Sequence, residues 1–150
     1  MPRRAVPFVI IGGACIVVGG LISAATAFSP SQIAAWAVAY LVLVAGVAQV
    51  ALGLGQGLLA SDPPSWRLVC IEIIAVNIGN AAVIAGTLVR MPFVVDAGGA
   101  LLVLALALLI WGVRGSRDRM RWVLYGYRLL TLIVLVSIPI GLVLSHIRAV

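Results

Sequence analysis

The sequence predicts an all-α integral membrane protein, a bundle of five transmembrane helices with a cytoplasmic N-terminus and an outside C-terminus. Three observations lead to this prediction: five long apolar segments, basic residues gathered on one side, and aromatic residues near the segment ends. Hydrophobic residues make up 64% of the chain and charged residues 9%, whereas a soluble domain is usually about a quarter charged. A chain this apolar cannot keep a polar surface in water, and its 150 residues fit one membrane domain.

The apolar segments fill nearly the whole chain, and only short connections separate them. Each reaches or approaches the roughly 20 residues that a helix needs to cross about 30 Å of hydrocarbon. Fusing the third and fourth segments would bury Arg90, Pro92 and Asp96 inside one helix, which is costly in lipid. Five helices are therefore favoured over four. We expect them at about 7–28, 30–59, 66–89, 93–113 and 122–146.

The first and second segments each need a comment. Arg3 and Arg4 followed by an apolar stretch resemble a secretory signal, but the stretch is long enough to span, so we expect a retained helix. The second segment would measure about 45 Å as a regular helix. It must tilt, protrude or unwind, with unwinding expected near the glycines at 53–57. Ser29 is expected to cap its start.

The arginines set the expected orientation. With the N-terminus inside and five alternating helices, eight of the ten basic residues fall in or beside inner segments, and only Arg90 and Arg148 fall outside. Cytoplasmic segments carry such an excess. Trp66, Trp111 and Trp122 lie at the same inner ends, where amphipathic rings favour the headgroup level. The exclusive use of Arg also favours a GC-rich bacterial genome, and the plasma membrane is the expected location.

The net charge of +6 would suggest nucleic acid in a soluble protein. Here the charges border apolar segments, so we expect the lipid bilayer, including anionic headgroups, and no nucleic acid as partner. The densest basic cluster lies between the fourth and fifth segments. It either determines topology, which is the plainer interpretation, or contacts a lipid headgroup or an acidic partner. Its residues are Arg114, Arg117, Arg119 and Arg121.

Small residues and polar residues share the third segment. Small residues at heptad spacing from Ala75 to Gly86 predict a seam against another helix. A similar pattern in the first segment, from Gly19 to Ala27, favours packing within the chain. Polar side chains are expensive against lipid and should face protein or water. The candidate cluster on the third segment consists of Glu72, Asn77, Asn80 and Thr87, with Gln49 on the second segment as its counterpart.

We expect the second and third segments to form an antiparallel hairpin. Counting from their shared connection places Gln49 and Asn77 at similar depth. Gln49 should then hydrogen-bond to Asn77 or Asn80, and Gly53 should leave room for Glu72. Interhelical hydrogen bonding is the plainer role for the two asparagines.

Glu72 has two interpretations. A carboxyl group in the hydrocarbon can carry a proton or bind a cation in a transport pathway. It can instead be a structural acid, either protonated or paired with Arg67 or Arg128, that holds helices together.

The residues do not assemble into a catalytic set. The chain has one His and two Cys, and no CxxC pair, phosphate-binding loop or paired carboxylates, so we expect no enzyme, cofactor or metal. The leading hypothesis is a non-catalytic accessory or assembly subunit of a larger membrane complex, whose partners are other membrane subunits or further copies of the chain. The alternative is a small oligomeric transporter or channel with a polar route near Glu72, Asn77 and Asn80.

Overall fold

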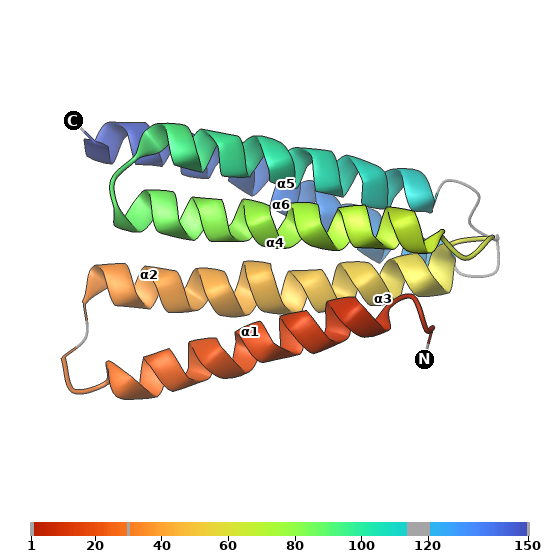
Figure 1. The fold of residues 1–150 in the computed structure, drawn as a ribbon, viewed down its shortest axis with the longest axis horizontal. Coiled ribbons are helices and arrows are strands. Elements are labelled where there is room, and N and C mark those ends of the chain that lie inside the picture. Colours follow the sequence, from red (N-terminus) through yellow and green to blue (C-terminus); the bar gives the residue numbers. More distant parts are fainter. Residues whose placement is uncertain (1, 30, 114–120, 150) are drawn as a thin grey trace.

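The computed structural model describes residues 2–29, 31–113 and 121–149, and every regular element in these ranges is a helix (Figure 1). Five helices in these ranges are long and apolar enough to cross a membrane. Their ends differ from the predicted ones by at most three residues. The elements are α1 (Val6–Ala25), α2 (Gln32–Tyr40), η1 (Leu41–Ala48), α3 (Gln49–Leu59), α4 (Trp66–Leu88), α5 (Pro92–Gly112) and α6 (Arg121–Ala149).

The helices run side by side along the long axis and alternate in direction (Figure 1). The N-terminal residues and the α3–α4 connection lie at one end of the bundle, and the α1–α2 and α4–α5 connections lie at the other. The Arg4 guanidinium lies over the Trp66 ring, 4.3 Å from its centroid. This cation–π contact joins the start of the chain to the start of α4.

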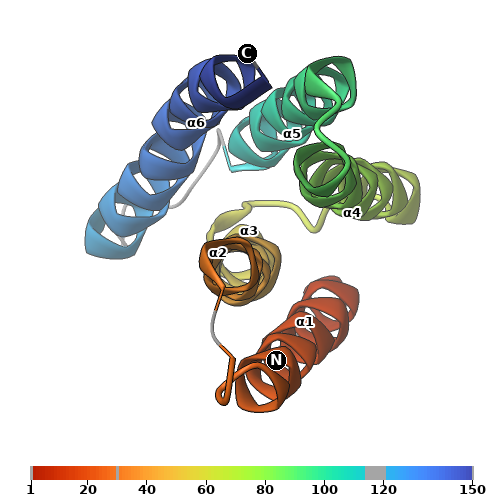
Figure 2. The ribbon, with the colours of Figure 1, turned by 90° about the vertical axis from the view of Figure 1, so that its left-hand side faces the viewer.

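The rod formed by α2, η1 and α3 lies between α1 on one side and α4, α5 and α6 on the other (Figure 2). Its middle part, η1, is a π-helix of eight residues. The irregularity of this long segment therefore lies at Leu41–Ala48, whereas residues 53–57, where unwinding was one of the three expected possibilities, are α-helical. Those glycines stay α-helical because they serve close contacts: Gly53 meets Phe8, and Gly55 meets Tyr127.

The small-residue seam on α4 packs against α5. A Cβ on Gly79 would lie 2.8 Å from Leu102 Cγ, and a Cβ on Gly98 would lie 2.8 Å from the Gly79 carbonyl oxygen. Real Cβ atoms do not approach so closely, so both glycines are required for this backbone approach. The predicted seam is confirmed, and its partner is the next helix in the chain.

The first helix packs on the rod through a different set of small residues from the expected one. A Cβ on Gly12 would lie 2.8 Å from the Gly46 carbonyl oxygen, and Gly19 meets Val42. Ser23 and Ala27, which were expected to extend the seam from Gly19, are exposed. The contact of α1 with the rod is therefore made by Gly12 and Gly19, which are seven residues apart. Residues at this spacing stay on the same face of a helix, so both face the rod.

Serine side chains cap the N-terminal ends of two of the helices. Ser31 Oγ accepts a hydrogen bond from the Ala34 N–H at 3.1 Å, and Ser65 Oγ accepts one from the Leu68 N–H at 3.2 Å. Each satisfies a donor that the first helical turn leaves unpaired. The cap of α2 is thus Ser31, and the expectation of Ser29 was wrong because the helix begins two residues later.

Candidate polar site between α3 and α4

Two buried polar side chains meet where α3 ends and α4 begins. Gln56 Nε2 donates a hydrogen bond to Glu72 Oε1 at 2.8 Å, and the two residues are 1% and 0% exposed. The antiparallel course of α3 and α4 brings these positions together. A Cβ on Gly112 of α5 would lie 2.7 Å from Gln56 Nε2. The glycine therefore makes the room that the amide occupies.

Tyr127 of α6 closes the third side of this pair. Its ring packs on Gly55, and its hydroxyl donates a hydrogen bond to the Leu109 carbonyl oxygen at 3.2 Å. That carbonyl group lies in the last turn of α5. The Val113 N–H, which would be its regular helical partner, bonds to the Ile110 carbonyl oxygen instead. A helix end leaves such carbonyl groups without a helical partner, and Tyr127 supplies one.

A second polar pair lies farther along α4. The Tyr40 hydroxyl donates a hydrogen bond to Asn80 Oδ1 at 3.0 Å, and Asn80 is 3% exposed. Asn80 follows Glu72 by eight residues, which places it about 12 Å farther along the helix axis. The interface of α4 with the rod therefore holds two separate polar contacts, one near each end.

Several polar atoms at this interface have no hydrogen-bond partner. They are both amide atoms of Gln49, Oε2 of Glu72 and Nδ2 of Asn80. Burying an unpaired amide or carboxyl atom costs on the order of several kcal/mol in an apolar medium. Native structures contain few such atoms, and each one asks for an explanation such as a bound water or a functional role.

The expected hydrogen bonds of Gln49 are not formed. Asn77 Nδ2 donates to the Ile73 carbonyl oxygen of its own helix at 2.8 Å, and Asn80 is bonded by Tyr40. Thr87 likewise bonds to its own helix, with its hydroxyl donating to the Val83 carbonyl oxygen at 2.7 Å. Phe8, rather than Glu72, occupies the space beside Gly53. Of the predicted cluster, Gln49, Glu72 and Asn80 face the buried interface, whereas Asn77 and Thr87 are half-buried.

The arginine partners proposed for Glu72 point elsewhere. Arg67 and Arg128 are both exposed, and the only hydrogen bond that the described residues make to the Glu72 carboxyl comes from Gln56. Of the basic cluster, Arg114, Arg117 and Arg119 lie outside the described residues, and Arg121 is the first residue of α6.

Three residues of the site are absent from the predicted cluster: Gln56, Tyr40 and Tyr127. Gln56 follows Gln49 by seven residues, so the heptad spacing of two glutamines in an apolar segment was a usable signal. The tyrosines gave no such signal, because aromatic residues near segment ends are expected at the headgroup level.

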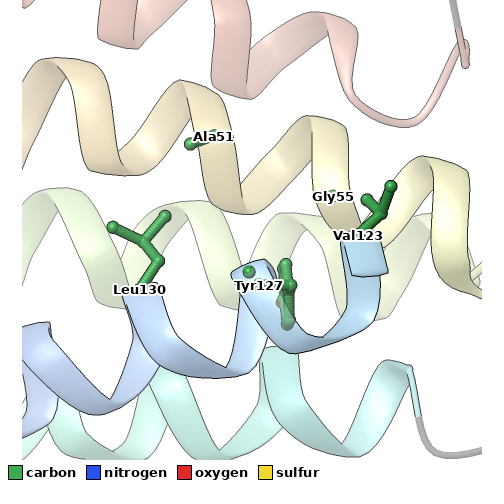
Figure 3. A pocket seen from close by; sticks show the side chains of 6 residues that line it. Ala51, Gly55, Val123, Tyr127 and Leu130 are labelled. Atoms are coloured by element: carbon green, nitrogen blue, oxygen red, sulfur yellow. The ribbon is translucent and has the colours of Figure 1, made fainter. Parts of the chain in front are cut away.

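A groove of about 270 Å³ opens beside this site, between α3 and α6 (Figure 3). Tyr127 lines it together with three small residues and two larger aliphatic ones. The lining residues are Ala51, Gly55, Val123, Gly126, Tyr127 and Leu130.

Within the described residues, no three His, Cys, Asp or Glu side chains gather as a metal site would require. Comparison with protein-family models, curated proteins and solved structures gives no match to this chain.

Proposed function

We propose that the protein is a non-catalytic subunit that assembles with other transmembrane helices, either of partner subunits or of further copies. The observation that carries the proposal is a set of glycines that face away from the bundle. A Cβ on Gly13, Gly20 or Gly126 would meet no atom within 4 Å. On α1 these glycines directly follow Gly12 and Gly19, which are packed inside.

Two adjacent stripes of glycine on one helix have different uses. The inner stripe, Gly12 and Gly19, fits α1 against the rod. At the outer stripe, Gly13 and Gly20, the fold leaves room for a Cβ, and each glycine lowers helix propensity by about 1 kcal/mol relative to alanine. Helices associate in lipid through close backbone approach at small residues. A second helix docked on the outer stripe accounts for its composition.

The groove between α3 and α6 supports the same proposal. Its lining includes the small residues Ala51, Gly55 and Gly126 as well as Tyr127. Such a surface accepts the side chains of a neighbouring helix. The chain thus offers two separate faces, on α1 and on α3 with α6, which is what an assembly subunit between two neighbours requires.

Assembly through α1 is tested by the double variant Gly13→Leu, Gly20→Leu. We expect it to fold with an unchanged melting temperature and to lose its stoichiometric partner, or its oligomer, on purification in mild detergent. A Cβ at either position meets no atom of this chain within 4 Å, and leucine side chains there should hold a second helix away. The matched control is Ile10→Leu, which keeps an exposed apolar side chain on the same helix. A double variant that retains the wild-type complex would show that α1 is not the contact.

We further propose that the N-terminus is cytoplasmic and that the membrane is the plasma membrane. The basic residues at the end of the bundle that holds Arg3 and Arg4 support this orientation. In a chain without Cys15 and Cys70, a cysteine at Asp62 should react with a membrane-impermeant maleimide only in inverted vesicles. A cysteine at Ser29 should react in whole cells. Labelling of the Asp62 position in whole cells and of the Ser29 position only in inverted vesicles would show that the N-terminus lies outside.

A further inference from the structure

We propose that the start of α6 binds the phosphate group of an anionic phospholipid, with Arg128 and Tyr125 as the donors. This inference does not depend on assembly with other subunits, because it uses a different face of α6. Gly126 and Leu130, which line the groove, lie two positions from Arg128. Two positions on an α-helix are about 200° apart, so the lipid site and the groove lie on nearly opposite sides of α6.

Arg128 is an exposed cation within an apolar helix. The part of α6 that is long and apolar enough to cross a membrane is Trp122–Ile140, and Arg128 lies six residues, about 9 Å, from its start. Leu129 and Leu132 beside it are 59% and 55% exposed. In a bilayer this surface meets lipid, where an arginine is expensive unless a partner compensates its charge.

The acidic residues that the structure describes do not compensate Arg128. Glu72 is fully buried and is bonded by Gln56. Asp96 lies near the start of α5, at the opposite end of the bundle, and Asp62 lies in the exposed α3–α4 connection. In the part of the chain that the structure describes, Arg128 forms no ion pair. The bilayer itself offers a counter-charge in the phosphate groups of its lipids.

The direction of α6 brings the guanidinium of Arg128 back toward the headgroups. Cα–Cβ bonds in an α-helix tilt toward its N-terminal end, and α6 begins at the end of the bundle that holds the N-terminal residues and the α3–α4 connection (Figure 1). The stem of the arginine can lie along the apolar surface while its charged head reaches the interface. The turn that it passes over carries Tyr125, three residues earlier.

Two exposed aromatic residues accompany Arg128 at this level. Tyr125 is 61% exposed and Trp122 is 88% exposed. Amphipathic rings of this kind favour the depth of the headgroups, which is where lipid phosphates lie. A guanidinium presents a planar fork of N–H donors that fits two oxygens of one phosphate. The Tyr125 hydroxyl supplies a further donor one turn away.

The charge at this end of the bundle favours an anionic lipid. Arg3, Arg67 and Arg128 are exposed there, and Arg121 is the first residue of α6. Clustered basic residues attract a headgroup with a net negative charge and repel the ammonium group of a zwitterionic one. A soluble phosphate ion has the same oxygens but lacks the acyl chains that can pack on exposed leucines such as Leu129.

Native mass spectrometry of the purified full-length protein, titrated with phosphatidylglycerol in a neutral detergent, tests the site. We expect the wild type to retain phosphatidylglycerol more tightly than phosphatidylcholine with the same acyl chains. Arg128→Gln should weaken this binding about fivefold or more, because one basic residue near a membrane surface contributes an attraction of that order. Arg128→Lys, which keeps the charge but loses the fork, should bind with intermediate affinity. Tyr125→Phe should weaken binding less than Arg128→Gln.

The matched control is Arg67→Gln, which removes an exposed positive charge at the same end of the bundle, on α4. It should bind phosphatidylglycerol as the wild type does. All four variants should keep the wild-type melting temperature in detergent, because every replaced side chain is exposed.

Four results would contradict the proposal. Wild-type affinity in Arg128→Gln would remove the site, and equal losses in Arg67→Gln and Arg128→Gln would leave only a diffuse attraction. Equal retention of phosphatidylcholine would show that the site does not select an anionic lipid. Displacement of phosphatidylglycerol by inorganic phosphate at constant ionic strength would make the soluble ion the ligand. None of these results bears on whether the outer glycines of α1 hold a partner.

Discussion

Replacing Gln56 or Glu72 alone by leucine should destabilise the bundle, whereas replacing both should recover most of the lost stability. Each single change strands a buried polar group whose partner, 2.8 Å away in the native protein, is gone. Such a stranded group costs about 1–3 kcal/mol, and more when it is charged. Removing both polar groups together leaves an apolar contact, and replacements of this kind are often neutral or stabilising.

The melting temperature and the fraction of monodisperse protein in mild detergent measure this effect across the four chains of a double-mutant cycle. Gln56→Leu should be the more damaging single change, because it removes the only hydrogen-bond donor that the described residues offer to the carboxyl. Asn77→Leu serves as a control at a half-buried site whose amide bonds to its own helix. Strictly additive losses in the double variant would mean that the two side chains do not interact.

Gly53→Leu should be the most damaging of the glycine substitutions. A Cβ at this position would overlap the Phe8 side chain, which is 1% exposed and lies in the main hydrophobic cluster. Overpacking a filled core costs typically about 1–3 kcal/mol, and here the overlap involves Phe8 Cβ, close to the backbone, so rotation of the ring does not relieve it. We expect a large fall in melting temperature and a small yield of monodisperse protein.

The companion variant Phe8→Ala, Gly53→Leu tests the reason for that loss. If the two side chains compete for one space, the double variant should be more stable than Gly53→Leu alone. Gly13→Leu, five residues from Phe8 on the outward side of the same helix, should keep the wild-type melting temperature. A Gly53→Leu protein that melts like the wild type would show that α1 does not pack on α3 at this point.

The sequence was sufficient to predict the five helices but not the contacts between them. Apolar length alone determines where a helix can cross hydrocarbon, so all five helices were predicted to within three residues. The seam on α4 was also predicted, because heptad spacing of small residues is a local property. Which helix fills a seam depends on the arrangement of the whole bundle, and the pattern around Gly79 does not contain that information.

The polar site was predicted only in part for a related reason. Glu72, Asn80 and Gln49 were found because polar residues in apolar segments must avoid lipid. Their hydrogen bonds were assigned by counting rises along a regular helix, which gives the depth of a residue but not the side chain that it meets. The long side chain of Tyr40 then reaches Asn80, and Gln56 rather than Gln49 meets an α4 partner. A count of residues does not account for either effect.

The contact between Arg4 and Trp66 bears on the order in which the protein is made. A chain leaves the ribosome from its N-terminus, so Arg4 is present throughout the synthesis of α1, α2, η1 and α3 before its aromatic partner exists. During that time its guanidinium lacks the ring that it contacts in the folded protein. The N-terminal residues can contact Trp66 only once α4 has begun to emerge. This contact is therefore the step in biosynthesis that connects the first half of the bundle to the second.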